Sequence, residues 1–281
     1  MKKIERGQQF LRQHLNLFQC PVCHEAYHAV IENSLSCPNG HQLDLSKKGT
    51  LYFLQRQVQS EYDAAMLASR RRILQAGLFD GFLDVVREKL PKAGVGLDVG
   101  CGEGTPLHKL EADLKTAIGF DISKAGVNLA TQQDTAAFFC VADLAHLPFN
   151  AATFDVILNI FSPSNYREFA RIMRPDAQVI KVIPNTDYLS ELRQALFAGD
   201  RRAVYSNEKV LAHFKESYRQ VTAQRVRYQF TIPPENFADL VLMTPLHWQA
   251  TPEQLQQLLA QPFPQITVDV TVLIGAQSVL D

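Results

Sequence analysis

Four residues near the amino terminus have the side chains and the spacing of a metal site. Cys20 and Cys23 are separated by two residues, and Cys37 and His41 follow as a C-x3-H pair. Three thiolates and one imidazole form the closed tetrahedral ligand set of a structural zinc ion. A proline after two of the cysteines and a glycine before the histidine favour the tight turns that such a site needs. We therefore expect these four residues to bind zinc, with His24 as a less favoured alternative to His41.

A second set of residues has the pattern of a nucleotide-binding turn. The stretch 96–104 reads Gly-Leu-Asp-Val-Gly-Cys-Gly-Glu-Gly, an apolar strand that runs into glycines at positions 100, 102 and 104. Glycine allows positive φ and a close approach of the backbone to a ligand, and the next helix would point unpaired N–H groups at that ligand. The dinucleotide fingerprint requires a third small residue at position 105, where this sequence has threonine. The turn therefore predicts a nucleotide-type ligand other than a dinucleotide.

Three acidic residues stand at the ends of three consecutive expected strands. Asp98 ends the first strand, and Asp121 ends the second, where a carboxylate can accept both hydroxyls of a ribose. Asp143 ends the third and can accept from an exocyclic amine, while Leu144 flanks an adenine ring. Each acid alone would be typical of a helix cap or a turn. Because all three are in register with the glycine turn, together they predict a nucleoside site.

Regular alternation of apolar strands and helices begins at Val95 and must position these acids. It predicts an α/β fold with a Rossmann-like, doubly wound sheet whose ligand lies at the carboxyl ends of the strands. An antiparallel pair is expected to close the sheet. The expected strands are 95–99, 116–121, 137–141, 154–160, 178–183, 220–232 and 266–274, and the expected helices are 106–114, 124–131, 165–173, 189–197, 234–243 and 252–260.

The region before Val95 is expected to form separate elements. Residues 1–18 have an irregular amphipathic pattern typical of a docked helix. Residues 27–35 are expected to form a hairpin inside the zinc site, and residues 42–54 a strand that leaves it. These patterns divide the chain into an N-terminal extension with a zinc-binding ribbon (1–54), a helical connection (55–92) and an α/β domain (93–281).

Composition and charge limit the classes of partner. The 281 residues contain 28 Lys and Arg against 29 Asp and Glu, which excludes a uniformly basic coat for nucleic acid. Residues 1–72 hold 10 basic against 6 acidic residues, so a phosphate backbone would dock there, near Lys48 and Arg71, unless these charges form an ordinary solvated face. No apolar run long enough for a membrane span occurs, and we expect a soluble cytoplasmic protein whose clustered cysteines hold metal.

Residues 96–104 resemble the first motif of the class I S-adenosylmethionine-dependent methyltransferases, and this resemblance extends over about residues 93–185. A narrower resemblance joins the Cys/His cluster, the stretch 66–77 and the late element Met243-Thr-Pro-Leu-His-Trp248. This combination is similar to the RlmA family of 23S ribosomal RNA guanine-N1 methyltransferases, which carry an N-terminal zinc ribbon. Two features depart from that family: an extension precedes the first cysteine, and Pro175-Asp176-Ala177 replaces a Pro-Gly-Gly turn.

The resemblance implies a function and a set of cofactor contacts. It implies methyl transfer from S-adenosylmethionine to N1 of a guanine in a hairpin loop of 23S rRNA, close to where macrolides bind. It also implies a homodimer whose zinc domains flank an RNA cleft. The implied cofactor residues are Asp98, Gly100, Gly102 and Gly104 near the methionine part, Asp121 and Ile122 near the ribose, and Asp143 and Leu144 near the adenine.

Candidate substrate contacts lie in the loop after the fourth strand. This loop runs from Asn159 to Pro163 and opens onto the cofactor pocket in this fold class. Phe161 could stack on an unstacked base, and Asn159, Ser162 or the Ser162 carbonyl could meet its edge. Phe161 is equally typical of a core aromatic, and Trp248 of either a pocket lid or plain packing. Guanine N1 must lose a proton, and Glu168 and Asp187 are the carboxylates considered for it, although both are equally typical of a helix surface.

Two other functions remain open at this stage. The chain could be a binding protein for RNA or a nucleotide with a degenerate methyltransferase domain, which the altered Pro-Gly-Gly turn would favour. It could also be a methyltransferase for a small molecule, which would have no use for a zinc ribbon. The three acids at consecutive strand ends favour an active cofactor site.

Overall fold

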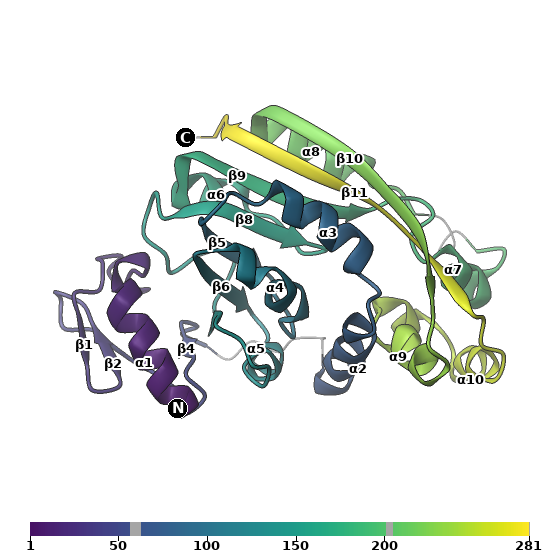
Figure 1. The fold of residues 1–281 in the computed structure, drawn as a ribbon, viewed down its shortest axis with the longest axis horizontal. Helices are drawn as coiled ribbons and strands as arrows, with labels where there is room; N and C mark the ends of the chain where they lie inside the picture. Colours follow the sequence, from purple (N-terminus) through teal and green to yellow (C-terminus); the bar gives the residue numbers. More distant parts are fainter. Residues whose placement is uncertain (57–62, 201–204, 281) are drawn as a thin grey trace.

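An eight-stranded sheet with helices on both faces forms the body of the computed structural model, which describes residues 1–56, 63–200 and 205–280 (Figure 1). The strand order is β10-β11-β9-β8-β5-β6-β7-β4. The strands from β9 to β4 are parallel, whereas β11 pairs antiparallel with both β9 and β10. This arrangement confirms the expected Rossmann-like sheet and its antiparallel closure.

The elements have the following bounds. The strands of the sheet are β4 (Leu51–Tyr52), β5 (Val95–Val99), β6 (Thr116–Asp121), β7 (Phe138–Val141), β8 (Phe154–Ile160), β9 (Met173–Pro184), β10 (Tyr218–Thr231) and β11 (Gln265–Ser278). The helices are α1 (Lys3–His14), α2 (Ala64–Gln75), α3 (Asp80–Lys89), α4 (Thr105–Leu110), α5 (Lys124–Ala130), α6 (Tyr166–Ile172), α7 (Ser190–Phe197), α8 (Glu208–Ser217), α9 (Phe237–Leu242) and α10 (Pro252–Ala260). Short 3-10 turns lie at Leu15–Leu17, Glu111–Asp113, Pro234–Asn236 and Pro245–Gln249.

Each face of the sheet has its own apolar core. Helices α2, α3, α4, α5, α7, α9 and α10 contribute buried residues to one core, and α1, α6 and α8 contribute to the other. Val156 and Leu158 of β8 face the first core, whereas Ile157 faces the second. This alternation follows from the two-residue period of a strand, and it explains why the central strands are apolar throughout.

The N-terminal region forms a small three-stranded sheet and also extends the main sheet. Strands β1 (Ala29–Ile31), β2 (Ser34–Ser36) and β3 (Gln42–Asp44) pair antiparallel, and they lie with α1 at one end of the molecule (Figure 1). The chain then turns at Gly49, where φ is +74°, and β4 pairs parallel with β7. The expected single strand over 42–54 is thus two short strands, because this turn redirects the backbone.

Aromatic side chains join this N-terminal region to the main sheet. The Phe10 ring of α1 stacks on Phe138 of β7 with centroids 4.6 Å apart. Phe18 is fully buried and contacts Phe53, Phe138 and Phe149. The amphipathic pattern of residues 1–18 therefore corresponds to a helix whose apolar side docks on the sheet.

The domain boundaries at 54 and 92 remain predictions. Helices α2 and α3 occupy most of the expected connection, while residues 57–62 of that connection and residues 201–204 and 281 of the expected third region lie outside the described residues. Among the described residues, none of the helices has the length and apolar character needed to cross a membrane.

Candidate metal centre and cofactor cavity

Cys20, Cys23, Cys37 and His41 come together in the N-terminal region with one potential ligand atom each, all within 4.8 Å of one another. The two cysteine sulfurs of Cys23 and Cys37 are 3.6 Å apart, and Nδ1 of His41 is 3.4 Å from Cys37 Sγ and 3.7 Å from Cys20 Sγ. Sulfurs around a tetrahedral zinc ion are separated by about 3.8 Å, since each Zn–S bond is about 2.3 Å. The donor set and its spacing fit zinc, and His24 is not part of this cluster.

A cavity of about 870 Å³ opens at the carboxyl ends of five adjacent strands. It runs from Asp143 and Leu144 after β7, past Asp121 and Gly100, to Ser162 after β8 and Pro184 at the end of β9. Two of the three acids predicted for a nucleoside, Asp121 and Asp143, therefore border one part of the cavity, and the loop predicted for a substrate base borders the other. Such a position is where open α/β sheets bind ligands.

The glycine turn has the backbone conformation that its sequence predicts. Gly100, Gly102 and Gly104 have φ of +69°, +55° and +86°. A side chain on Gly104 would collide with Ala130, so this glycine permits packing. By contrast, a Cβ on Gly102 would meet no atom closer than 4.0 Å, and both Gly100 and Gly102 line the cavity. The absence of a side chain at Gly102 therefore keeps this part of the cavity open for a ligand.

The carboxylate of Asp121 holds the glycine turn against the next helix. Its Oδ2 accepts from the Gly102 N–H at 2.9 Å, and its Oδ1 accepts from the Ser123 N–H at 2.7 Å. Burial raises the pKa of Asp121, and the two N–H donors oppose that rise. Asp121 also lines the cavity, and a carboxylate oxygen can accept more than one hydrogen bond.

Asp98 lies behind the turn as a fully buried acid. Its Oδ2 has no hydrogen-bond partner among the described residues, and burial together with the charge of Asp121 raises the pKa of Asp98 to about 7. An unpartnered carboxylate oxygen beside a glycine turn fits a cationic ligand group, such as the ammonium of S-adenosylmethionine. Although Asp98 does not itself line the cavity, Arg70 does and lowers the pKa of Asp98 by its charge.

At the far end of the nucleoside side, Asp143 and Leu144 both line the cavity together with Ile122. Oδ1 of Asp143 accepts from the Ala145 N–H at 2.9 Å, which fixes the turn after β7. The Ile122 side chain is exposed to solvent. These three residues provide an acid and two apolar side chains, the combination that suits an adenine ring.

The loop after β8 is held from below by a buried lysine. Lys181 of β9 donates to Oδ1 of Asn159, to the Ser162 carbonyl at 3.2 Å and to Ser164 Oγ at 2.9 Å. Asn159 in turn donates to Ser162 Oγ at 2.6 Å and to the Pro163 carbonyl at 2.8 Å. Asn159 is fully buried and does not line the cavity, so its side chain supports the loop. Burial lowers the pKa of Lys181 to about 8.

Phe161, Ser162 and Pro163 all line the cavity. Phe161 has φ of +54°, a strained conformation that clusters at functional sites, and its ring lies 5.1 Å from the Tyr188 ring. It also contacts Phe79 and Phe82, so its ring belongs partly to the core. Trp248 is 42% exposed and does not line the cavity, although the preceding residues Met243–Leu246 do.

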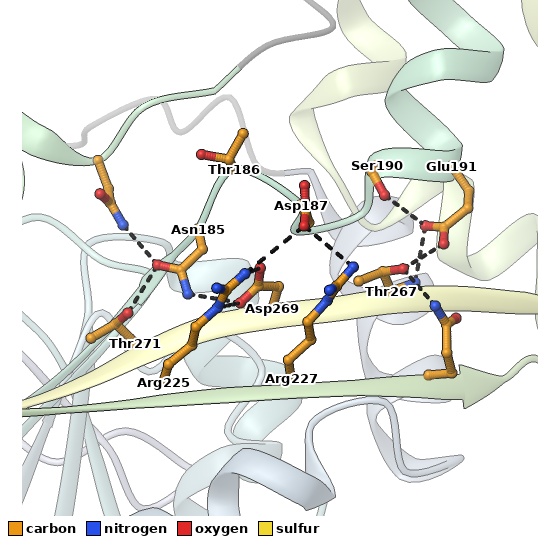
Figure 2. A network of polar contacts seen from close by, with 12 residues as sticks. Asn185, Thr186, Asp187, Ser190, Glu191, Arg225, Arg227, Thr267, Asp269 and Thr271 are labelled. Carbon is orange, nitrogen blue, oxygen red and sulfur yellow. Dashed lines mark hydrogen bonds and ion pairs between the residues drawn. The ribbon is translucent and has the colours of Figure 1, made fainter.

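The carboxylates considered as proton acceptors are engaged elsewhere. Glu168 pairs with Arg171 at 2.8 Å, and Asp187 pairs with Arg227 at 3.3 Å (Figure 2 shows the second pair). Neither lines the cavity. The basic stretch of α2 is also largely paired, since Arg71 bonds to Glu103 and Arg72 forms a bidentate pair with Asp239. Arg71 therefore supports the glycine turn and is not an exposed contact for phosphate.

Sequence reasoning did not identify Arg70, Tyr188 and Arg193 as residues of this cavity. Arg70 was part of a conspicuous basic run, but its direction toward the acids depends on how α2 packs. Tyr188 and Arg193 follow β9, which is the fifth of the strands expected from the sequence, in a region without a recognisable motif. A signal was available in their position, because residues just after a parallel strand lie at its carboxyl end.

The fold and the cavity define a class I methyltransferase that uses S-adenosylmethionine. A methyltransferase-domain model matches residues 97–181, and the model for the N-terminal region of RlmA, a zinc ribbon, matches residues 18–58. A phosphoethanolamine N-methyltransferase of Haemonchus contortus shares the fold with a TM-score of 0.50 at 12% identity, over 78% of this chain and 58% of that one.

Two curated relatives extend over nearly the whole chain. YxjB of Bacillus subtilis, named as a candidate 23S rRNA (guanine-N1)-methyltransferase, is 38% identical over 92% of this chain and 97% of its own. A 23S rRNA (guanine(748)-N1)-methyltransferase of Streptomyces fradiae is 27% identical over 91% of this chain and 95% of its own. The chain belongs to the family of 23S rRNA (guanine-N1)-methyltransferases.

The metal cluster gives a first prediction. Purified protein is expected to carry one equivalent of zinc, and Cys20→Ser or His41→Asn should remove most of it, because each removes one of four ligands. His24→Asn is the matched control, since His24 lies outside the cluster, and it should retain the full equivalent. Elemental analysis measures the outcome. If the His41 variant kept its zinc and the His24 variant lost it, His24 would be the ligand and the assignment of His41 would be wrong.

The buried lysine gives a second prediction. Because the pKa of Lys181 falls from its ordinary value to about 8, the unfolded chain binds more protons than the folded one above that pH. The Lys181 contribution to the free energy of unfolding should therefore rise by about 1–2 kcal/mol between pH 7.5 and 9.5. Urea unfolding of Lys181→Met should lack this rise, whereas the exposed-lysine control Lys215→Met should keep it. Identical pH dependence in both variants would contradict the assignment.

Proposed function

We propose that this protein transfers a methyl group from S-adenosylmethionine to N1 of a guanine in a hairpin loop of 23S rRNA, near the macrolide-binding site. The observation that carries the proposal is the single cavity, which joins the acid-bearing ends of β6 and β7 to the loop after β8. Support for the rRNA substrate comes from the relatives, of which the Streptomyces fradiae protein is named for guanine 748. The zinc ribbon supports the same choice over a small-molecule substrate.

We assign the methionine part, the ribose and the adenine of the cofactor to three successive parts of the cavity. The glycine turn, with Asp98 behind it, binds the methionine part, and Arg70 balances the acids there. Asp121 accepts from the ribose hydroxyls while it continues to hold Gly102. Asp143, Leu144 and Ile122 surround the adenine.

When bound, S-adenosylmethionine supplies an electrophilic methyl group on a sulfonium. The protein then has mainly to hold guanine N1 at attack distance and in line with that methyl group. Phe161 and Pro163 offer apolar surface to an unstacked base, and the Lys181–Asn159 network fixes the loop that carries them. Ser162 is held by its bonds to Asn159 and Val99, so its role is to set the loop position. Trp248, at the surface beside the lining residues Met243–Leu246, would contact the RNA outside the cavity.

The zinc ribbon and a homodimer belong to the same proposal. Cys20, Cys23, Cys37 and His41 bind zinc and thereby fix the ribbon, which presents exposed Lys47 and Lys48 to the RNA backbone. A second copy of the chain would place another ribbon across the RNA. Because the ribbon docks on the sheet through Phe18, RNA held by it lies in a fixed position relative to the cavity.

Primer extension tests the function directly. Extension on 23S rRNA is expected to stop one nucleotide before the modified guanine when the rRNA has been incubated with the protein and S-adenosylmethionine, because N1 methylation blocks base pairing. The control is the same incubation without S-adenosylmethionine, which should give full-length extension product. Cofactor binding without a stop would favour a binding protein or a small-molecule methyltransferase.

The ribose contact gives a further prediction. Asp121→Ala should weaken binding of S-adenosylhomocysteine by a few kcal/mol at most, because it removes a charged acceptor and frees the Gly102 N–H. Isothermal calorimetry measures the affinity. Asp176→Ala, which removes an exposed acid of β9, is the matched control and should bind like the wild type. Unchanged affinity in Asp121→Ala would exclude the assigned role.

A further inference from the structure

Arg193 is a buried cation with unused hydrogen-bonding capacity. It lies in α7, is 5% exposed and lines the cavity. One guanidinium nitrogen donates to the Thr186 carbonyl, while Nε has no hydrogen-bond partner among the described residues. An unsatisfied buried donor of this kind is costly in a folded protein. Because Arg193 also lines the cavity, its unused donor capacity points to a ligand with acceptor atoms.

The acids nearest to Arg193 are turned toward other partners. Asp187 pairs with Arg227 at 3.3 Å and lies 3.9 Å from Arg225, and both arginines project from β10 (Figure 2). Glu191 accepts from the backbone N–H of Thr267 at 3.0 Å and from its hydroxyl (Figure 2). No carboxylate of the described residues forms an ion pair with Arg193. The charges of Asp187 and Glu191 act on Arg193 only from beyond ion-pair distance, so neither acid occupies its donors.

Arg193 lies on the substrate side of the cavity. It follows β9, and β8 separates β9 from β5, whose glycine turn begins the cofactor side. Tyr188 lies near it, and the loop after β8 adds the aromatic Phe161 and the apolar Pro163 to the lining of the same cavity. Among the described lining residues, the basic ones are Arg193 and Arg70, and Arg70 lies near the acids of the cofactor side. The charges of both arginines act on Tyr188. The aromatic and apolar lining beside Arg193 fits a base better than it fits a phosphate, which usually collects several donors.

We propose, building on the function proposed above, that Arg193 binds the O6 and N7 edge of the target guanine and stabilises the negative charge that forms on O6 during methyl transfer. Arginine in a fork geometry is the commonest partner of this guanine edge. The same contact selects guanine, because adenine presents an N6 amino group where guanine presents O6. Arg193 is then both a specificity-determining and a catalytic residue.

The chemistry balances without a carboxylate base. The N1 proton leaves to water, and the electron pair it leaves behind is shared between N1 and O6. N1 then forms a bond to the methyl carbon, while the bond from that carbon to sulfur breaks and its electron pair remains on the sulfur. A guanidinium at O6 lowers the energy of the deprotonated base and of the transition state that follows from it.

A synthetic hairpin with a modified target base tests the contact. Once primer extension has located the guanine, that position is replaced by 7-deazaguanine, which lacks the N7 acceptor. For the wild type, kcat/KM is expected to be about tenfold lower with this RNA than with the guanine RNA. On the guanine RNA, kcat/KM of Arg193→Met should be about a hundredfold below that of the wild type. Replacing guanine by 7-deazaguanine should lower kcat/KM of Arg193→Met by less than about twofold. Arg193→Lys keeps the charge without the fork and should lie between the two.

Arg219→Gln is the matched control, because Arg219 is exposed on β10 at the end of the sheet opposite to the cavity. It should keep the full penalty for 7-deazaguanine. Calorimetry with S-adenosylhomocysteine should give wild-type affinity for Arg193→Lys and Arg193→Met, which separates a substrate contact from general damage. If one variant fails to fold, the other carries the comparison.

The pH dependence provides a second readout. The charged and titratable groups around Arg193 are Asp187, Glu191, Tyr188 and Tyr205, and both acids are bonded elsewhere. Removal of the cation should shift the rise of kcat/KM with pH upward by about one unit in Arg193→Met, because the deprotonated base loses its partner. The Arg219→Gln profile should match that of the wild type.

The outcomes separate this inference from the function on which it rests. Absence of N1-methylguanine with wild-type protein refutes the proposed function and this role together. Methylation with equal 7-deazaguanine penalties in wild type and Arg193 variants refutes the role alone. If a methylphosphonate next to the target guanine removes the difference between wild type and Arg193→Met, Arg193 binds phosphate and the base contact is wrong.

Discussion

The site depends on the two hydrogen bonds that the Asp121 carboxylate accepts from backbone N–H groups. By accepting from the N–H groups of both Gly102 and Ser123, this carboxylate ties the end of β6 to the glycine turn after β5 and to the start of α5. Gly126 of α5 can then approach the Gly102 carbonyl so closely that a Cβ would lie 2.8 Å from it. Glycine at position 102 is needed for the positive φ, and the carboxylate fixes that conformation. A residue expected to bind the cofactor thus also shapes the turn that receives it.

The chain that leaves the zinc-binding ribbon joins the main sheet beside the cofactor side. β4 follows the ribbon and pairs with β7, Leu51 opposite Cys140, and the Phe53 N–H donates to the Val141 carbonyl at 2.8 Å. Two residues further along the chain from Val141 stands Asp143, at the mouth of the cavity. Because α1 and Phe18 pack on the same edge, the ribbon has little freedom to move against the cavity. This rigidity is what a protein needs if one part holds RNA and another modifies one of its bases.

The sequence allowed the central fold to be predicted where local patterns and tertiary structure agree. β5, β6 and β8 begin and end as expected, since each is an apolar run bounded by turn residues. β9 begins at Met173, earlier than expected, and α8 was missed because few apolar residues mark it and only Phe214 and Ser217 are buried. Around the cavity, Gly100, Gly102, Asp121 and Asp143 could be placed from their register in the sequence. Arg193 in the lining and Lys181 beneath the loop after β8 could not, because their surroundings are made by segments distant in sequence.

The two arginines of the cavity show how neighbouring acids decide what a buried cation can do. Arg70 faces Asp98 and Asp121, so its charge is used to hold carboxylates that burial would otherwise protonate. Arg193 has two acids close to it in sequence, but Arg225 and Arg227 pair with Asp187 on β10, and Thr267 binds Glu191 (Figure 2). Asp269, fully buried and paired with Arg225 at 2.6 Å, keeps that arginine in place. The ion pairs on β10 therefore hold Asp187 away from direct contact with Arg193, although the charge of Asp187 still acts on that arginine.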